Sequence, residues 1–128
     1  MIGIVVPVHD EEACLDACLQ ALRVAATCPL LRGEAVGIVI VLDACSDDSQ
    51  RIVLAHAMQA DLPWRLDCIS VDARNVGAAR AAGARLLLER GARWLAFTDA
   101  DTCVAPDWLC MQLSQQADAV CGTVAVDD

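Results

Sequence analysis

Two acidic side chains, separated by one residue, directly follow an apolar segment. Asp99 and Asp101 come after residues 93–98, which end in Leu-Ala-Phe-Thr. In an extended chain, side chains two residues apart point the same way, so both carboxylates can face one pocket. Two short carboxylates are too few for a closed calcium cage, but they suit Mg²⁺ or Mn²⁺, which keep waters and substrate phosphates as ligands. The alternative is that both residues cap the turn into a helix at Pro106.

A glycine-containing helix start offers a place for phosphate. Residues 75–83 read Asn-Val-Gly-Ala-Ala-Arg-Ala-Ala-Gly, and the N-terminus of a helix attracts anions. Gly77 allows close backbone approach, and Arg80 on the second turn can reach a phosphate. The alternative is that the glycines permit tight packing against a sheet. The glycine spacing is not that of the dinucleotide fingerprint, and the segment follows the third predicted strand rather than the first.

Polar residues also follow the other apolar segments. Asp43 comes directly after residues 36–42, and a carboxylate there can accept hydrogen bonds from a base or a ribose. His9 and Glu11 follow residues 2–7. His9 can stack on a base or be a polar loop residue, and Glu11 can bind a ligand or be a first-turn helix charge. First-turn charges are also the simpler interpretation of Glu12, Asp47 and Asp48.

The apolar pattern predicts strands that alternate with helices. Short apolar, β-branched runs typical of buried strands occupy residues 2–7, 36–42, 66–71, 93–98 and 119–126. Helices are predicted over residues 11–26, 46–60 and 76–90, and in a short segment from Pro106. We expect Asp10 and Ser46 to cap the first two helices. The alternation predicts an α/β fold with a mostly parallel sheet and helices on both faces. Ligands of such sheets bind outside the carboxyl ends of the strands, where the polar residues above would gather.

The bulk composition is that of one soluble domain. The chain has 128 residues, of which 57% are hydrophobic, enough for a core of its own. Its net charge of −9 argues against nucleic acid or an anionic membrane surface as a partner. No stretch is long enough to span a bilayer and the start lacks the basic region of a signal peptide, so we expect a cytoplasmic protein. The eight cysteines lie in apolar segments without a Cys-x-x-Cys pair, so we expect small buried side chains and no zinc site.

Four motifs occur in the order and at the spacing of family 2 glycosyltransferases. Residues 6–12, Val-Pro-Val-His-Asp-Glu-Glu, resemble the family's opening Pro-x-(Tyr/His)-Asn-Glu motif. Residues 42–48, Leu-Asp-Ala-Cys-Ser-Asp-Asp, resemble its Asp-Asp-x-Ser-x-Asp motif, and residues 75–83 are similar to its Asn-x-Gly-x-x-x-Ala-x-x-Gly helix. Residues 97–102, Phe-Thr-Asp-Ala-Asp-Thr, with Pro-Asp-Trp-Leu at 106–109, are very similar to its metal motif and the following helix. Together the motifs cover nearly the whole chain.

The resemblance implies the GT-A fold of nucleotide-diphospho-sugar transferases. It implies that His9 and Asp43 contact the base of the nucleotide. It assigns Asp99 to the ribose and sugar-phosphate region, and Asp101, with Asp99, to Mg²⁺ or Mn²⁺ at the diphosphate. Arg80 would lie near the phosphates. The other positions expected to bind the nucleotide sugar are Pro7, Glu11, Asn75, Gly77 and Ala100. The expected donor is a UDP- or GDP-linked sugar, and the expected reaction is metal-dependent transfer of that sugar to an acceptor hydroxyl.

Two departures from the family pattern bear on this expectation. Ala44 stands where the family often has a second Asp, so one contact to the base is missing or moves to Asp43. The chain ends at Asp128, whereas family members usually continue into an acceptor half that carries the catalytic base. We therefore expect residues 1–128 to form a single, truncated nucleotide-sugar-binding domain. No residue in it is assigned as the base that an inverting reaction needs.

Other functions either stay open or fit the sequence less well. A non-catalytic module that binds a nucleotide sugar would carry the same motifs. A nucleotidyltransferase would have a Gly-rich, basic loop after its first strand, whereas the loop here reads His-Asp-Glu-Glu. A NAD-binding domain fails on the placement of the glycines. A membrane-associated acceptor and a homo-oligomer, formed through apolar surface around the last strand, stay open.

Overall fold

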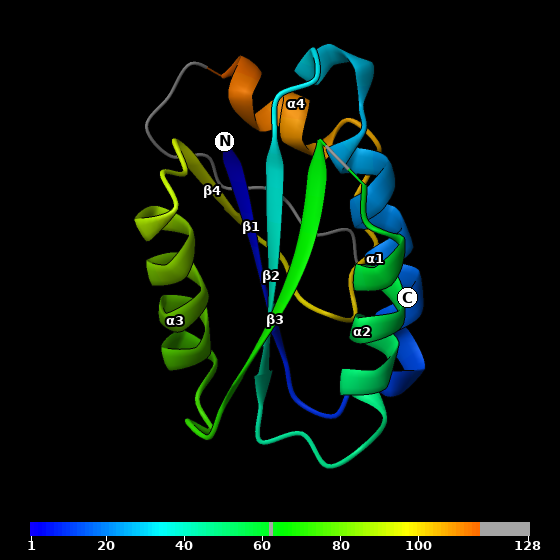
Figure 1. Cartoon of the computed structure of the whole chain (residues 1–128), viewed down its shortest axis with the longest axis vertical. Coiled ribbons are helices and arrows are strands. Elements are labelled where there is room, and N and C mark those ends of the chain that lie inside the picture. Colours follow the sequence, from blue (N-terminus) through cyan, green and yellow to red (C-terminus); the bar gives the residue numbers. More distant parts are fainter. Residues whose placement is uncertain (62, 116–128) are drawn as a thin grey trace, which may run out of the picture.

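The molecule is built around a parallel β-sheet. The computed structural model describes residues 1–61 and 63–115. Four strands form the sheet in the order β3-β2-β1-β4 (Figure 1). Their bounds are Ile2–Val8 (β1), Val36–Asp43 (β2), Trp64–Val71 (β3) and Trp94–Phe97 (β4). β1 and β2 are almost completely buried, as expected of apolar strands that are covered on both faces.

Strand β1 has a neighbour on each side over only part of its length. It pairs with β2 along all of Ile2–Val8, but its pairing with β4 ends at Val5. The carbonyl of Val5 accepts a hydrogen bond from the N–H of Thr98, so the backbone of Pro7, two residues on, also faces the β4 side. The missing N–H of proline is tolerated there because no strand continues beside it. The carboxyl end of β1 is therefore open toward β4, at the point where the strand order reverses.

Helices cover both faces of the sheet, as the sequence predicts. Helices α1 (Glu12–Ala26) and α2 (Ser49–Gln59) lie on one face, and α3 (Val76–Glu89) lies on the other (Figure 1). Helix α4 (Trp108–Ser114) and the 3₁₀ helix η1 (Pro29–Leu31) lie near the edge at which the strands begin. All the loops that follow the carboxyl ends of the strands are thus gathered at the opposite edge.

Helix α3 approaches the sheet closely through a glycine. A β-carbon at Gly83 would lie 2.6 Å from Val5 Cγ1 and 2.9 Å from Val41 Cγ2, closer than side chains pack. The alternative in which this glycine serves packing is therefore confirmed. The core under α3 is small and consists of Val5, Val39, Val41, Ala79 and Leu87. The larger core fills the face covered by α1 and α2.

Both predicted helix caps are wrong. Helix α2 begins three residues after Ser46, and its N-cap residue, Asp48, makes no cap hydrogen bond with its side chain. The N-cap position of α1 is Glu11 rather than Asp10. The physical reason is a bond between the two loops, because Asp10 Oδ1 accepts a hydrogen bond from the N–H of Ser46 at 2.7 Å. The carboxylate expected to cap α1 is used to hold the loops after β1 and β2 together.

The remaining differences lie in the cysteines and at the carboxyl-terminal side. Among the described cysteines, Cys18 alone is buried, whereas Cys14 and Cys103 are exposed and the others are half-buried. Cys14 lies on the solvent-exposed side of α1, and Cys103 lies in the loop after β4, so neither reaches the core. Helix α4 starts two residues after Pro106. The strand predicted over residues 119–126 lies outside the described residues.

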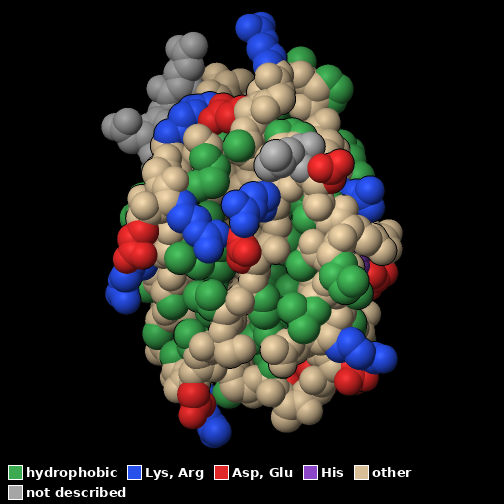
Figure 2. Space-filling model, in the orientation of Figure 1, with side chains coloured by type: hydrophobic (Ala, Val, Ile, Leu, Met, Phe, Trp, Pro, Cys, Tyr) green, Lys and Arg blue, Asp and Glu red, His purple; other side chains and the backbone are tan. Residues whose placement is uncertain are grey.

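The surface carries apolar side chains on most elements. Strand β3 is at the edge of the sheet and is only partly buried. The side of the molecule seen in Figure 2 carries hydrophobic side chains over its middle, among basic and acidic ones. The exposed large hydrophobic residues of the described part are Val24, Leu30, Leu54, Met58, Val76, Leu88, Phe97 and Met111. Within that part, no helix combines the length and the apolar character needed to cross a membrane.

Candidate functional site

Three loops at the carboxyl edge contain a residue in the left-handed conformation. Asp10 follows β1 with φ 49°, Ala44 follows β2 with φ 52°, and Arg74 follows β3 with φ 50°. Residues other than glycine rarely adopt positive φ, and the strain persists only where surrounding contacts impose it. Such strain concentrates at functional sites. The edge predicted to bind a ligand therefore carries three of the four such residues of the described part; the fourth, Arg32, ends η1 at the opposite edge.

The buried carboxylate of Asp43 is occupied by backbone groups. Asp43 is 5% exposed to solvent. Oδ1 accepts hydrogen bonds from the N–H groups of Ala73 and Arg74 at 2.9 and 2.8 Å, and Oδ2 accepts one from Asn75 at 2.9 Å. These bonds, that of Arg74 first, hold the pKa of Asp43 below its ordinary value. Asp43 therefore fixes the loop after β3, which leaves a ligand little of the carboxylate beyond the remaining acceptor capacity of Oδ2.

His9 joins the ends of β1 and β2 and still presents a ring to solvent. Its Nδ1 lies 2.7 Å from the carbonyl oxygen of Asp43. A carbonyl only accepts, so Nδ1 must carry the proton of this hydrogen bond. The other ring nitrogen, Nε2, lies 3.8 Å from Asp10 Oδ2, and the side chain is 65% exposed. The ring is thus held in orientation by one nitrogen while its surface stays accessible, as stacking on a base requires.

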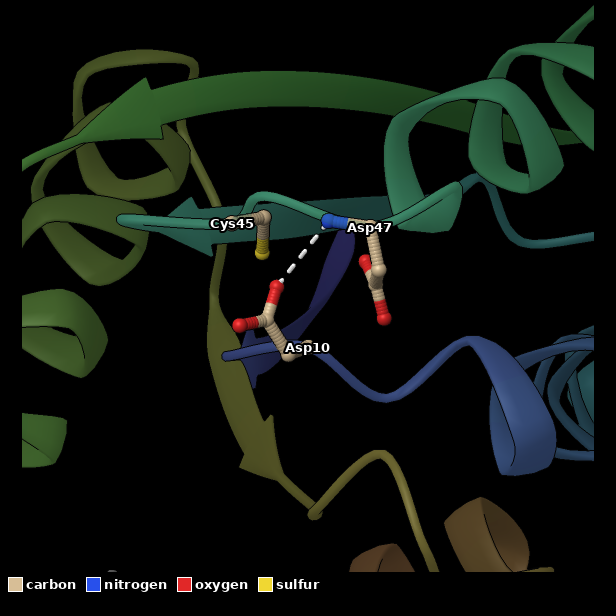
Figure 3. A group of neighbouring side chains, drawn as sticks. All are labelled: Asp10, Cys45 and Asp47. Carbon is tan, nitrogen blue, oxygen red and sulfur yellow. Dashed lines mark hydrogen bonds between the residues drawn. The ribbon is translucent and has the colours of Figure 1, made fainter.

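Asp10, Cys45 and Asp47 form a tight group whose ligand atoms lie within 4.8 Å of one another (Figure 3). Both oxygens of Asp10 are used, since Oδ1 accepts from the N–H groups of Ser46 and Asp47, and Oδ2 from Ser46 Oγ. The oxygens of Asp47 accept from the N–H groups of Glu12 and Ser49. Burial raises the pKa of the Cys45 thiol, so it stays protonated at neutral pH. A protonated thiol and two occupied carboxylates do not fit Mg²⁺ or Mn²⁺. This group serves to tie the loops together.

The two glutamates after β1 are used differently. Glu12 Oε2 accepts a hydrogen bond from the N–H of Asp48 at 3.0 Å, so this carboxylate binds the loop before α2. The backbone N–H of Glu11 donates to Ser49 Oγ at 3.2 Å. No described residue donates a hydrogen bond to the half-buried side chain of Glu11. Of the two, Glu11 retains the carboxylate that a ligand can use.

The start of α3 is formed by Asn75 and Gly77. Asn75 is the N-cap residue, and its Oδ1 accepts a hydrogen bond from the N–H of Ala78 at 2.9 Å. A β-carbon at Gly77 would lie 3.2 Å from that oxygen, so a side chain there would press on the cap. The N–H groups of Val76 and Gly77 precede the first hydrogen bond within the helix and are oriented outward. This arrangement suits an anion, as the sequence predicts for the helix start at Asn75 and Gly77.

The segment after β4 forms a turn rather than the extended chain expected. The N–H of Thr102 donates to the carbonyl of Asp99 at 3.1 Å, and Ala100 is buried, 3% exposed. The side chain of Ala100 therefore anchors the turn in the core, and only its backbone remains for a ligand. The carboxylates of Asp99 and Asp101 on either side are both exposed.

The carboxylates of Asp99 and Asp101 differ in how much of their hydrogen-bonding capacity is already used. Asp99 Oδ1 accepts a hydrogen bond from Arg80 Nη2 at 2.9 Å, which ties the turn to α3. Asp101 Oδ1 has one long contact, 3.4 Å, with the hydroxyl of Thr102. Exposed hard oxygens of this kind fit Mg²⁺ or Mn²⁺, which bind proteins through one or two carboxylates and complete their shell with phosphate and water. Asp101 is the freer ligand, and Asp99 offers its second oxygen.

The structure therefore gathers most of the predicted residues at one edge. Pro7, His9 and Glu11 lie at and after the open end of β1, and the turn with Asp99 and Asp101 follows β4 on the other side of that opening. Ligands of open α/β sheets bind at such a reversal of strand order. Asp43, Asn75, Gly77 and Arg80 line the same edge from β2 and α3.

Sequence reasoning missed two residues that shape the site. Asp10 was expected to cap a helix, and Arg74 was given no role of its own. Asp10 binds the loop after β2, and Arg74 both receives the support of Asp43 and pairs with Asp72 at 3.1 Å. No glycine marks either left-handed position; an aspartate tolerates this conformation, which is a weak signal at Asp10, whereas the sequence carries no signal for Arg74.

The described surface is hollowed in at least two places. One of about 390 Å³ is lined by Gly77, Arg80, Ala81, Ala84 and Phe97, beside the Arg80–Asp99 pair. The other, of about 560 Å³, lies between α1 and α2, where the ring of His56 contacts Asp16 at 2.7 Å. The larger hollow lies away from the strand ends, so volume alone does not locate the site.

Comparison with solved structures agrees with this fold. Crystal structures of S. aureus TarS 1–349, alone and in complex with UDP, match with a TM-score of 0.67 at 18% and 19% identity, and cover 88% and 89% of this chain. A crystal structure of S. aureus TarS also matches, with a TM-score of 0.67, 18% identity and 88% coverage of this chain. The chain spans 31% of the length of the first two and 19% of the third. At this identity the likeness shows the fold, and the predicted α/β fold of the GT-A type is confirmed.

Comparison at the level of sequence gives the family. None of the curated proteins matches this sequence. A match to the family described as "Glycosyl transferase family 2" extends over residues 3–128, nearly the whole chain. The chain belongs to glycosyl transferase family 2.

Proposed function

We propose that this chain is the donor-binding domain of a glycosyltransferase and binds a nucleotide-diphosphate sugar with Mg²⁺ or Mn²⁺. The observation that carries the proposal is that the pairing of β1 with β4 ends at Val5, so that His9 follows β1 on one side of this open strand end and the turn bearing Asp99 and Asp101 follows β4 on the other. A base and a diphosphate would be held by loops from opposite sides of that opening. Membership of the family supports the same reading.

Each part of the donor has residues suited to it. The exposed ring of His9 would stack on the base, beside Pro7 and the remaining acceptor capacity of Asp43. The outward N–H groups at the start of α3, near Asn75 and Gly77, would bind phosphate oxygens. Arg80 neutralises Asp99 in the free domain, and a diphosphate would give its guanidinium a second anionic partner.

Asp101 would hold the cation, with the second oxygen of Asp99 as a further ligand. When bound, a divalent cation supplies neutralisation of the charge that develops on a leaving diphosphate. The protein alone is poorly equipped for that task, because its net charge is −9 and its site edge is rich in carboxylates. This deficit of positive charge supports a metal-bridged site.

A uridine donor is favoured over a guanosine donor by one observation. One of the similar TarS structures was determined in complex with UDP. The acceptor hydroxyl and the base that deprotonates it are assigned to no described residue. A non-catalytic module that only binds the donor therefore remains the second candidate. Cytoplasmic location, a membrane-associated acceptor and a homo-oligomer stay predictions.

Thermal unfolding tests the proposal. UDP with Mn²⁺ should raise the unfolding midpoint of the chain more than either does alone, and EDTA should remove the gain. Asp101→Asn should lose the gain, whereas the matched control Asp61→Asn, an exposed carboxylate before β3, should keep it. Stabilisation that persists in EDTA would overturn the metal-bridged site. Release of UDP from a UDP-sugar would select the enzyme over the binding module.

A further inference from the structure

Two cysteine thiols lie in contact at the edge of the sheet opposite the candidate site. Cys110 Sγ lies 3.3 Å from Cys28 Sγ and donates a hydrogen bond to it, although the residues are 82 positions apart. Cys28 immediately precedes η1, and Cys110 lies in α4. Figure 1 shows η1 and α4 close to the edge where the strands begin. Within the described residues, this is the one hydrogen bond between two thiols.

Both side chains are held in place by their surroundings. Each is half-buried and packs against the core on the α1 and α2 face. Leu109, next to Cys110, is completely buried, and Gln112 one turn on accepts a hydrogen bond from Trp94 Nε1 at 3.0 Å. Helix α4 is thus anchored on the fold with its thiol facing Cys28.

We propose that Cys28 and Cys110 form a reversible disulfide by exchange with a low-molecular-weight disulfide such as glutathione disulfide. A disulfide bond is about 2.05 Å long, so the two sulfurs, which lie 3.3 Å apart, must approach by about 1.3 Å. Disulfides inside reducing compartments are commonly transient and redox-sensing. The pair differs in this respect from the other described cysteines, which have no thiol partner in hydrogen-bond contact.

The exchange is balanced in two steps. The Cys28 sulfur, which accepts the hydrogen bond from Cys110, loses its proton to solvent and reacts first as a thiolate. That thiolate attacks one sulfur of glutathione disulfide and expels one glutathione thiolate, leaving a mixed disulfide. Cys110 then loses its proton, attacks Cys28 Sγ and expels the second glutathione. Two protons from the cysteines pass to the two glutathione thiols, and two electrons pass from the cysteine sulfurs to the oxidant.

The environment of Cys110 suits the second step. Burial first, and then the hydrogen bond with Cys28, raise the pKa of Cys110 to about 11. Its thiol is therefore a poor first nucleophile at neutral pH. Once Cys28 carries a mixed disulfide, the adjacent sulfur is already within contact distance, and proximity favours closure over release into solvent.

The disulfide would restrain the α4 end of the segment that carries Asp99 and Asp101. Residues 98–107 join β4 to α4 and contain Asp99 and Asp101. A bond between α4 and the segment before η1 would restrain the unfolded chain over a loop of 82 residues. The unfolding midpoint should then rise by roughly 5–15 °C, and amide hydrogen exchange in α4 should slow. These effects do not require that the donor site bind any ligand.

The test is equilibration of the chain in buffers of graded glutathione to glutathione disulfide ratio. After acid quenching and alkylation of free thiols, peptide mass mapping should find a Cys28–Cys110 cross-link that grows with oxidation and disappears on reduction. The wild-type midpoint should rise with it. Cys28→Ser and Cys110→Ser should lose both effects, and the control Cys68→Ser, a half-buried thiol in β3, should keep them.

The result is decisive in the wild-type protein even if a serine variant fails to fold. The proposal is overturned if mapping finds only mixed disulfides on single cysteines, or both thiols free at ratios that modify the exposed Cys14. A cross-link that forms without a rise in midpoint or slower exchange in α4 would overturn the proposed restraint.

Discussion

The carboxylate of Asp43 holds Arg74 in a left-handed conformation. The N–H of Arg74 donates to Asp43 Oδ1 at 2.8 Å, and the φ angle of Arg74 is 50°. A hydrogen bond across 31 positions therefore sets the path of the chain from β3 into α3. The start of α3, where a phosphate is expected to bind, is placed by a residue at the end of another strand.

Asp43→Asn should destabilise the fold. Both oxygens of the Asp43 carboxylate accept hydrogen bonds, whereas the asparagine amide has one oxygen and one NH₂ group. The NH₂ group would therefore replace an acceptor and face a backbone N–H. At least one of the three backbone N–H groups would lose its acceptor. We expect the unfolding midpoint to fall by roughly 5–10 °C. Differential scanning calorimetry should find this loss in Asp43→Asn and not in Asp61→Asn, and equal midpoints would contradict the role of Asp43.

The same carboxylate should give stability a dependence on acid. The pKa of Asp43 is lowered from its ordinary value of 3.8, chiefly by the N–H of Arg74. A depressed carboxyl pKa contributes stability that is complete above the unfolded-state pKa and is lost as the pH falls through the folded-state value. Urea midpoints should therefore drop as the pH is lowered through about 3.8, where Asp43 is half protonated in the unfolded chain.

Glu34, which lies just before the start of β2, should also make the stability depend on acid. Both of its oxygens accept hydrogen bonds from Arg93 at 2.6 Å, which lowers its pKa from 4.5. In Asp43→Asn the acid loss should become shallower without vanishing, because Glu34 still titrates. A pH profile identical to that of the wild type would contradict a pKa of Asp43 that differs between the folded and the unfolded chain.

Ala44→Asn should stabilise the protein. Ala44 has a φ of 52°, a conformation that costs alanine about 1–2 kcal/mol and that asparagine tolerates better. The gain in the free energy of unfolding should be about 0.5–1 kcal/mol. Urea denaturation measures it, with the exposed loop residue Ala105 as the control, where Asn should have little effect. An equal response at both positions would mean that backbone strain at Ala44 is not the cause.

Gly83→Ala should be costly because α3 packs on the sheet through this residue. The added β-carbon would meet Val5 Cγ1 at 2.6 Å and Val41 Cγ2 at 2.9 Å, and both are attached to buried strands that cannot yield. Overpacking of this kind costs about 1–3 kcal/mol. Gly77→Ala in the same helix is the matched comparison, since its nearest neighbour is the Asn75 side chain at 3.2 Å. Chemical denaturation should rank Gly83→Ala as clearly the less stable variant.

Four of the strands and the parallel sheet could be predicted from the sequence, because strands buried on both faces need uninterrupted apolar residues; the order β3-β2-β1-β4 was not predicted. The convergence of Asp43, Asn75, Asp99 and Asp101 at one edge followed from the alternation of strands and helices. The use of each carboxylate could not be predicted. An acidic residue at a strand end has the same appearance whether it meets a ligand, as expected for Asp101, or three backbone N–H groups, as found for Asp43.

The loop contacts also escaped prediction, for a different reason. The hydrogen bond between Asp10 and Ser46 joins residues 36 positions apart. Helix-capping rules consider only residues that are close in the sequence, so they cannot predict this bond. Ala44 in a left-handed conformation leaves no mark in the sequence, because that conformation is usually signalled by glycine or asparagine. Backbone strain therefore becomes visible only in the folded chain.

The central claim is that a divalent cation at Asp101 links this domain to the diphosphate of a nucleotide. Calorimetric titration of UDP into the chain, with Mn²⁺ and then with EDTA, tests it most directly. We predict binding that weakens roughly tenfold or more in EDTA and to a similar extent in Asp101→Asn, about 1.4 kcal/mol, while Asp61→Asn binds as the wild type does. Equal affinity of the wild type and Asp101→Asn for UDP in Mn²⁺ would contradict the claim.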